Sequence, residues 1–311
     1  MSTTVTTPAA PPAAGRRPRR GLRSVTVQTP QERLLLGTAW GPRIVTWIVL
    51  LALAFLWLLP LAWAVNTSFK TEADAGALPL SWIPPNGFTL ESYRDVLGAG
   101  NIQTWFLNSI VVAVMVTVLT MVISSLAAYA FSRTTFRGKS LLFALTVGSI
   151  MVPPQILVVP LFQQMVSWRL VDTYWGIALP QVIAPVMVFI LKKFFDGIPI
   201  ELEEAARIDG ASRLRIFWSV VLPLSRPILA AVSIFVFINA WNNFLWPFIV
   251  TSEPELMTVP VGLPNVLSAY GEIYSQEMAA ATLAGLPLII VFMLFQRQIV
   301  QSVATTGLGG Q

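Results

Sequence analysis

The chain has 311 residues, of which 55% are hydrophobic and only 11% are charged, and its formal net charge is +5. Soluble proteins carry about 25% charged residues, so this composition excludes an ordinary soluble protein and indicates an integral membrane protein. The sequence has no cysteine and no histidine, which excludes disulfides, thiolate and imidazole metal sites, and catalysis by Cys/His or Ser/His pairs.

The first 43 residues form a basic arm rich in Ala, Pro, Thr and Arg. Because such a composition buries little apolar surface, we expect residues 1–43 to be disordered. The basic residues of the chain flank apolar segments and form no patch interleaved with aromatic residues. Their placement predicts contact with membrane lipid and argues against a nucleic-acid partner.

Six later segments are apolar enough to cross a membrane, which takes about 20 apolar residues. They are residues 44–65, 106–131, 140–162, 174–191, 227–250 and 278–296. The predicted fold is therefore an all-α membrane protein with six transmembrane helices. Residues 44–105 hold the first helix and an outer loop, 106–296 form the transmembrane core, and 297–311 form a short, mobile C-terminal tail.

The lysines and arginines predict the orientation of these helices, because basic residues favour the cytoplasmic side. With the N-terminus inside, 17 of the 20 basic residues fall on cytoplasmic segments, and only Lys70, Arg94 and Arg169 fall outside. Both termini and the loop after the fourth segment are then cytoplasmic.

Prolines interrupt the third and fourth segments next to two glutamines. Pro153 and Pro154 precede Gln155, and Pro180 precedes Gln181. Proline removes a helical hydrogen bond, so these helices should be kinked or unwound, with the freed carbonyls facing protein or water. Broken helices often line a transport pathway, although each proline could equally mark an ordinary packed kink.

The fifth segment carries amides among aromatic rings at its outer end: Asn239, Trp241, Asn242 and Asn243. Amides can both donate to and accept from sugar hydroxyls, and flat rings can stack on sugar C–H faces. The alternative is an interfacial tryptophan belt with interhelical hydrogen bonds. No charged residue lies within the six segments as bounded above, which favours a neutral solute over an ion-coupled pump.

The loop 199–223 is the most informative stretch. Pro199 suits a helix start, acidic residues follow it at the positive end of the helix dipole, and Gly210 suits the helix end. Ser212 can cap a second helix that Leu222-Pro223 ends. The apolar stripe expected on that helix is Leu214, Phe217, Trp218 and Val221. Such a charged helical hairpin suits docking to another protein, or it could rest on lipid headgroups as a solvated linker.

Within this loop, Glu204-Ala205-Ala206, then three residues, Gly210, nine residues and Val220-x-Leu222-Pro223 resembles the EAA motif of bacterial ABC-importer permeases. The one departure is Val220 in place of isoleucine. In that family the loop inserts into a groove on the ATP-hydrolysing subunit. The resemblance implies coupling roles for Glu204, Ala205, Ala206, Asp209, Gly210, Leu222 and Pro223.

The resemblance covers about residues 44–300. Residues 241–247, 257–263 and 295–297 look like the carbohydrate branch, similar to the smaller permease of maltose-type importers with a MetI-like core. It implies a sugar-translocating subunit in a bacterial cytoplasmic membrane. The implied partners are a second homologous permease, two ATP-binding subunits and an extracytoplasmic sugar-binding protein.

The chain itself has no phosphate-binding glycine loop of the GxxxxGK[ST] type. We therefore expect it to hold no cofactor and catalyse no reaction, with ATP bound by the partner subunits. Two alternatives stay open. The same machinery could carry a non-sugar solute such as an amino acid, an osmolyte or glycerol phosphate, or the chain could be a secondary transporter or an intramembrane enzyme.

Overall fold

The computed structural model describes residues 40–98, 101–267 and 273–308, and all regular secondary structure in these ranges is helical. The chain divides into two compact units, residues 1–59 and 60–311. The predicted disorder of the N-terminal arm concerns residues 1–43, most of which lie outside the described residues.

The first unit contributes the first part of helix α2 (Trp40–Ser68), which passes into the second unit at Pro60. This helix is apolar around its whole circumference, and none of its most hydrophobic window is buried within the chain. A helix with such a surface is stable only in an apolar surrounding, which lipid provides.

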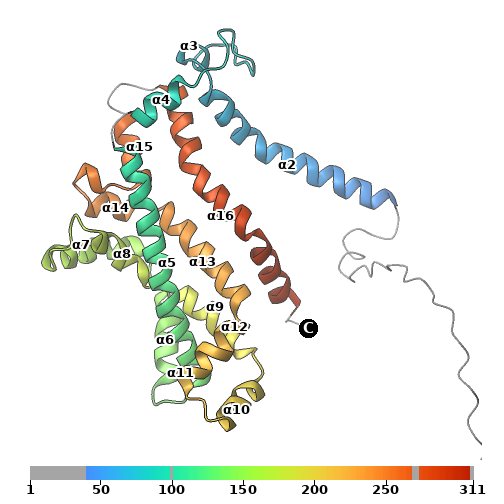
Figure 1. Cartoon of the computed structure of the whole chain (residues 1–311), viewed down its shortest axis with the longest axis vertical. Coiled ribbons are helices and arrows are strands. Elements are labelled where there is room, and N and C mark those ends of the chain that lie inside the picture. Colours follow the sequence, from blue (N-terminus) through green and yellow to red (C-terminus); the bar gives the residue numbers. More distant parts are fainter. Residues whose placement is uncertain (1–39, 99–100, 268–272, 309–311) are drawn as a thin grey trace, which may run out of the picture. The chain divides into compact units, whose positions relative to one another are not determined.

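In the second unit, helix α5 (Ile102–Arg133) is the central element, and α8, α9 and α13 pack against it (Figure 1). Its 32 residues span about 48 Å at 1.5 Å per residue. The small residues Ala113, Ser124, Ser125 and Ala128 are buried on it. Because they have short side chains, they let neighbouring helices approach closely.

The third and fourth predicted segments are both bent, as expected. The third breaks at Pro153 and Pro154, whereas Pro180 stays within a helix and the fourth segment breaks before Pro185. Helix α6 (Lys139–Ser149) meets the turn η1 (Pro154–Leu157) and α7 (Val158–Ser167) at 95°, and α8 (Tyr174–Val182) meets α9 (Pro185–Asp196) at 49°. Neither pair is one straight rod. Helix α9 also runs beyond the predicted boundary at residue 191, so it includes Lys192, Lys193 and Asp196.

The fifth segment consists of two helices. Helix α13 (Arg226–Trp241) ends at the predicted amides, and α14 (Leu245–Val250) begins after the break at residues 242–244. The preceding loop contains α10 (Ile200–Ile208), α11 (Arg213–Ile216), a π turn at Phe217–Val221 and α12 (Leu222–Leu224). Helices α11–α12 meet α13 at 81°.

Helix α16 (Tyr274–Leu308) contains the sixth segment and corrects the predicted tail. Residues 297–311 were expected to be mobile, but the helix continues to Leu308. The reason is local, because no proline or glycine interrupts residues 297–306. By length and composition, α2, α5 and α16 can each cross a membrane, and counting each bent pair as one span gives up to six.

The start of α5 packs into an apolar cluster that lies away from the loop 199–223. It includes Val96 of α4 (Glu91–Gly98), Trp105, Val259 of α15 (Val259–Leu267) and Ala279. In Figure 1, α4 and α15 lie at one end of α5, and α10 and α11 lie at the other.

The loop after α2, for which the sequence predicts the outer side, is anchored by its own first residues. Lys70 is buried, donates to the carbonyl of Ser81 at 2.6 Å, and lies 4.2 Å from the ring centroid of Trp63. Burial lowers the pKa of Lys70, and the Asp74 carboxylate of the short helix α3 (Glu72–Ala75) offsets part of that shift. Glu72 accepts hydrogen bonds from the backbone of Tyr274 and Ser275, which ties this loop to the start of α16.

Candidate transport cavity and coupling hairpin

A cavity of about 730 Å³ lies where the broken helices meet, between η1, α7, α8, α9, α13 and α14. Its volume is within the 300–1,000 Å³ that is usual for small-molecule sites. Five of the predicted pathway residues line it: Gln155, Gln181, Asn239, Asn242 and Asn243. Residues from three separate segments of the sequence thus gather at one site.

Two of these amides connect the walls of the cavity. Asn243 donates through Nδ2 to Oε1 of Gln181 at 2.8 Å, and Gln181 donates through Nε2 to the carbonyl of Ile177 at 2.8 Å. Asn243 also accepts from the backbone N–H of Trp246 at 3.4 Å. The Gln181–Asn243 pair therefore holds α8 against the break between α13 and α14.

The other three amides keep hydrogen-bonding capacity. Asn239 and Asn242 each donate to a carbonyl one turn earlier, that of Phe235 at 2.7 Å and that of Ile238 at 3.0 Å. Their side-chain oxygens have no partner among the described residues, and Gln155 is exposed. These groups can donate to and accept from a polar solute.

The cavity has no charged lining residue; its other walls are aliphatic and aromatic. An ionised solute that enters this cavity would lose its hydration without gaining a paired charge, which costs free energy. The lining therefore suits a neutral polar molecule. Within the described part of the chain, no group of three or more acidic residues could hold a metal ion.

Trp241 does not belong to this cavity, which corrects the sequence-based prediction. Its side chain is 2% exposed, packs with Phe106 and Phe237, and donates to the carbonyl of Ala284 at 3.2 Å. As the last residue of α13, it faces α16 instead of the broken helices. Trp246, which follows in α14, does line the cavity and donates to the carbonyl of Gly176 at 3.0 Å.

The loop 199–223 forms the predicted hairpin, which we call the coupling hairpin after the role that the sequence resemblance implies for it. Helix α10 ends in a left-handed residue, Gly210, with φ of +79°. Ala211 then donates to the carbonyl of Ala206 at 2.9 Å, which closes the turn in the manner of a Schellman motif. Ser212 caps α11 by accepting from the N–H of Arg215 at 3.4 Å.

The apolar stripe expected on the second helix of the hairpin is wrong in register. Phe217 and Val221 are buried as predicted, but Leu214 and Trp218 are exposed and Ile216 is buried instead. The cause is the π turn at Phe217–Val221, which changes the period of the helix. This wider turn precedes Pro223, which has no N–H to donate. The helix ends at Leu224, one residue after the predicted end at Leu222-Pro223.

The residues implied in coupling differ in exposure. Glu204, Ala205, Asp209 and Gly210 are exposed, whereas Ala206 packs against the core and Leu222 and Pro223 are half-buried. Exposed apolar side chains accompany them, and the most exposed are those of Ile208, Leu214 and Trp218, with Ile208 at 87%. The hairpin thus presents a mixed acidic and apolar surface, which is the kind that another protein covers.

A buried ion pair that sequence reasoning missed fixes the hairpin to the helices. Glu203, whose side chain is fully buried, lies 3.0 Å from Nε of Arg133 at the end of α5, and 3.6 Å from Arg207. Arg133 also donates to the carbonyls of Phe195, in the last turn of α9, and of Ile198, just after that helix. One guanidinium group therefore joins α5, the end of α9 and the coupling hairpin.

The chain is similar to known transport proteins over most of its length. Residues 120–305 match the family model of the binding-protein-dependent transport system inner membrane component. The arabinooligosaccharides transport system permease protein AraQ of Halalkalibacterium halodurans is 35% identical over 86% of this chain and 98% of its own. The sn-glycerol-3-phosphate transport system permease protein UgpE of Yersinia pestis is 35% identical over 82% and 93%.

A solved bacterial ABC transporter involved in alginate import has the same fold, with a TM-score of 0.73 and 22% identity over 87% of this chain and 98% of that chain. The helices, the cavity and these similarities define a multi-pass membrane permease. More specifically, the chain belongs to the family of binding-protein-dependent transport system inner membrane components, which are transport proteins and not a catalytic family.

Proposed function

We propose that the chain is the permease subunit of an ABC importer that moves a neutral carbohydrate across the cytoplasmic membrane. The observation that carries this proposal is the cavity between broken helices, which is lined by five amides and no charged residue. Membership of the family supports the transport function, and similarity to an arabinooligosaccharide permease supports the solute class.

The uncharged lining also bears on the strongest alternative solute. A relative of equal identity belongs to a glycerol-3-phosphate system. A phosphate monoester is an anion, and proteins usually pair such anions with arginine, lysine or backbone N–H clusters. Since none of the lining residues is basic, the cavity favours a polyhydroxy compound over glycerol phosphate.

We propose that two ATP-binding subunits supply the energy, one of which covers the coupling hairpin. Supporting this, the exposed surface of the hairpin combines Glu204 and Asp209 with Ile208, Leu214 and Trp218. The hairpin and both termini are then cytoplasmic. A soluble binding protein delivers the solute on the opposite side.

A second permease completes the pathway in this proposal. The amides of Gln155, Asn239 and Asn242 are exposed on this chain although they lie in apolar segments. Polar groups at membrane depth are normally covered by protein or water instead of lipid. A homologous partner that faces the cavity would provide that cover.

Uptake by membrane vesicles that contain the complete transporter tests the solute class. We expect ATP-dependent uptake of a neutral mono- or oligosaccharide from a panel that also holds glycerol phosphate, amino acids and osmolytes. Asn239→Leu combined with Asn242→Leu should lower that uptake at least about tenfold, because loss of hydrogen bonds to a polar substrate is costly. Gln163→Leu, an amide of α7 outside the cavity, is the matched control.

An equal loss of uptake in the control variant would show that the loss comes from altered packing and not from the cavity. Uptake of glycerol phosphate in preference to every sugar would contradict the solute class. Uptake by the purified chain alone without ATP would contradict the importer mechanism and favour a secondary transporter.

A further inference from the structure

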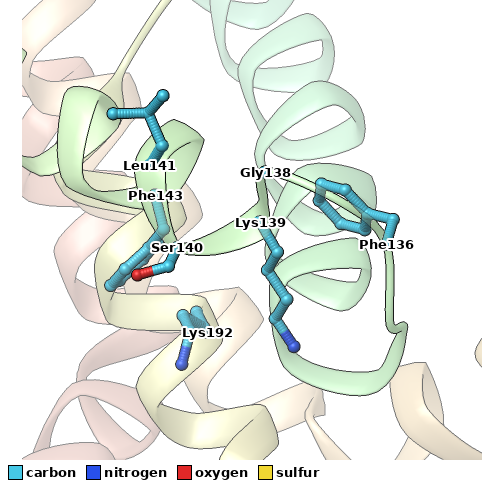
Figure 2. Close-up of a pocket in the computed structure, with 7 residues that line it drawn as sticks. All are labelled: Phe136, Gly138, Lys139, Ser140, Leu141, Phe143 and Lys192. Atoms are coloured by element: carbon cyan, nitrogen blue, oxygen red, sulfur yellow. The ribbon is translucent and has the colours of Figure 1, made fainter.

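A second cavity, of about 700 Å³, lies at the hairpin end of the bundle, away from the amide-lined cavity. The loop from α5 to α6, the first turn of α6 and the last turns of α9 form its walls. Lys139 and Lys192 supply its cationic groups, and Phe136, Leu141 and Phe143 supply apolar surface (Figure 2). None of its lining residues belongs to the coupling hairpin or to the transport cavity.

The two amino groups leave donors available at this cavity. Lys139 donates to the carbonyl of Thr134 at 2.9 Å, and Lys192 donates to the carboxylate of Asp196 at 2.7 Å. Each ammonium group has three N–H donors, so two remain on each lysine beyond these bonds. In Figure 2 both amino groups extend toward the same edge of the view, whereas Leu141 extends the opposite way.

The surrounding charge is positive overall. Arg137 and Lys193 lie on the same loop and helix but outside the lining, and Asp196 is the acid that contacts Lys192. Its carboxylate is already engaged by Lys192 and by the hydroxyl of Ser132 at 2.7 Å. An anion that reaches the cavity therefore meets two lysines and no unpaired carboxylate from these elements.

The apolar side of the cavity continues onto a surface that faces the membrane. Helix α6 has no buried residue, and Leu141, Leu142 and Leu145 are each about half or more exposed. Helices α6 and α9 belong to bent pairs that are long and apolar enough to cross a membrane. Lysines at a helix end place their amines at the headgroup level while their stems stay on apolar surface.

We propose that this cavity binds an anionic phospholipid, with the phosphate between Lys139 and Lys192 and the acyl chains along the exposed face of α6. A free anion would use the lysines and leave the leucine surface uncovered, and a neutral lipid would leave the ammonium donors unused. Basic cavities between transmembrane helices at the cytoplasmic face are suited to anionic headgroups.

Native mass spectrometry of the full-length protein with its co-purifying subunits tests this site. The protein is first loaded with phosphatidylglycerol or phosphatidylcholine. We expect Lys139→Gln with Lys192→Gln to lower the affinity for phosphatidylglycerol about 25-fold, since each lysine near an anionic surface adds about a factor of five and the two factors multiply. Arg137→Gln with Lys193→Gln removes the same charge just outside the cavity and should retain the lipid.

The single variant Lys139→Gln controls for misfolding, because the hydrogen bond of that lysine among the described residues is to a backbone carbonyl. It should give a partial loss with an unchanged unfolding temperature in detergent. Equal loss in both double variants, or in neither, would overturn the site. Retention of phosphatidylcholine equal to that of phosphatidylglycerol would overturn it too. Displacement of the lipid by inorganic phosphate would show that the lysines bind a free anion instead of a lipid headgroup.

Discussion

At the scale of single residues, the buried contact between Arg133 and Glu203 joins the coupling hairpin to the end of α5. Both side chains are withdrawn from water, and their Nε–Oε1 distance is 3.0 Å. Removing charges from water is expensive, and only close pairing with further hydrogen bonds offsets the cost. The carbonyls of Phe195 and Ile198 supply those further bonds.

Breaking this pair from either side should therefore be more damaging than replacing both residues. We expect Arg133→Met or Glu203→Met alone to lower the free energy of unfolding by about 3–5 kcal/mol, because each leaves a buried charge without its partner. The double variant should recover most of that loss. Chemical denaturation in mixed micelles measures all three variants.

Glu201→Met, an exposed position on the same helix, is the control and should change stability by less than about 0.5 kcal/mol. If the two single losses simply add in the double variant, the pair does not interact as described.

The sequence indicated an acidic helix start but could not show which of its three glutamates is buried. Glu201, Glu203 and Glu204 all lie in the first turns of α10, where the helix dipole favours each of them equally. Only the fold shows that Glu203 points inward, because Arg133 belongs to a helix far away along the chain. In contrast, the amides of the cavity were predictable, since polar residues in apolar segments are few.

At the scale of elements, the coupling hairpin depends on one left-handed residue. Gly210 has φ of +79°, and a Cβ there would meet no atom within 4 Å. Replacement is therefore opposed by backbone conformation and not by crowding. An L-residue in this region costs about 1–2 kcal/mol.

We expect Gly210→Pro to abolish uptake and solute-stimulated ATPase activity while the protein still inserts into the membrane, because proline cannot adopt a positive φ. Glu204→Lys should do the same through charge, since Glu204 is exposed and makes no ion pair among the described residues. Vesicle uptake, ATPase assays and membrane extraction measure these effects.

Gly87→Pro is the matched control, with φ of +81° and an equally open surrounding, but in the outer loop. Normal ATPase stimulation in Gly210→Pro, or an equal loss in Gly87→Pro, would show that the hairpin does not couple the two activities.

Helix breaks were predictable from sequence because proline acts on its own helix. The geometry after each break was not, since the bends of 95° and 49° depend on contacts with other segments: α6 contacts α9, α7 contacts α14, and α8 and α9 pack against α5. The π turn at Phe217–Val221 also escaped prediction. A regular helical period assigns Leu214 and Trp218 to the buried face, and one wider turn is enough to move them out.

At the scale of the whole molecule, composition determines the class of protein, and basic residues determine the expected orientation. The six apolar segments were found because a membrane span needs length and hydropathy more than any particular residue. Their arrangement around α5 was not predictable, because contacts between helices in lipid depend on small residues spread over the chain.

The absence of cysteine makes the orientation directly measurable, because a single introduced thiol is the only reactive one. We expect Arg137→Cys, in the loop between α5 and α6, to react with a membrane-impermeant maleimide only after the membrane is opened. Ile83→Cys, which replaces a 79% exposed residue of the outer loop, should react in intact cells. The reason is the excess of basic residues on the side of Arg137.

The unmodified chain is the background control, and a permeant maleimide should label both variants. Labelling of Arg137→Cys in intact cells would show that the chain has the opposite orientation in the membrane. The coupling hairpin, which lies at the same end of α5 as that loop, would then face away from cytoplasmic ATP, and the importer mechanism could not operate through it.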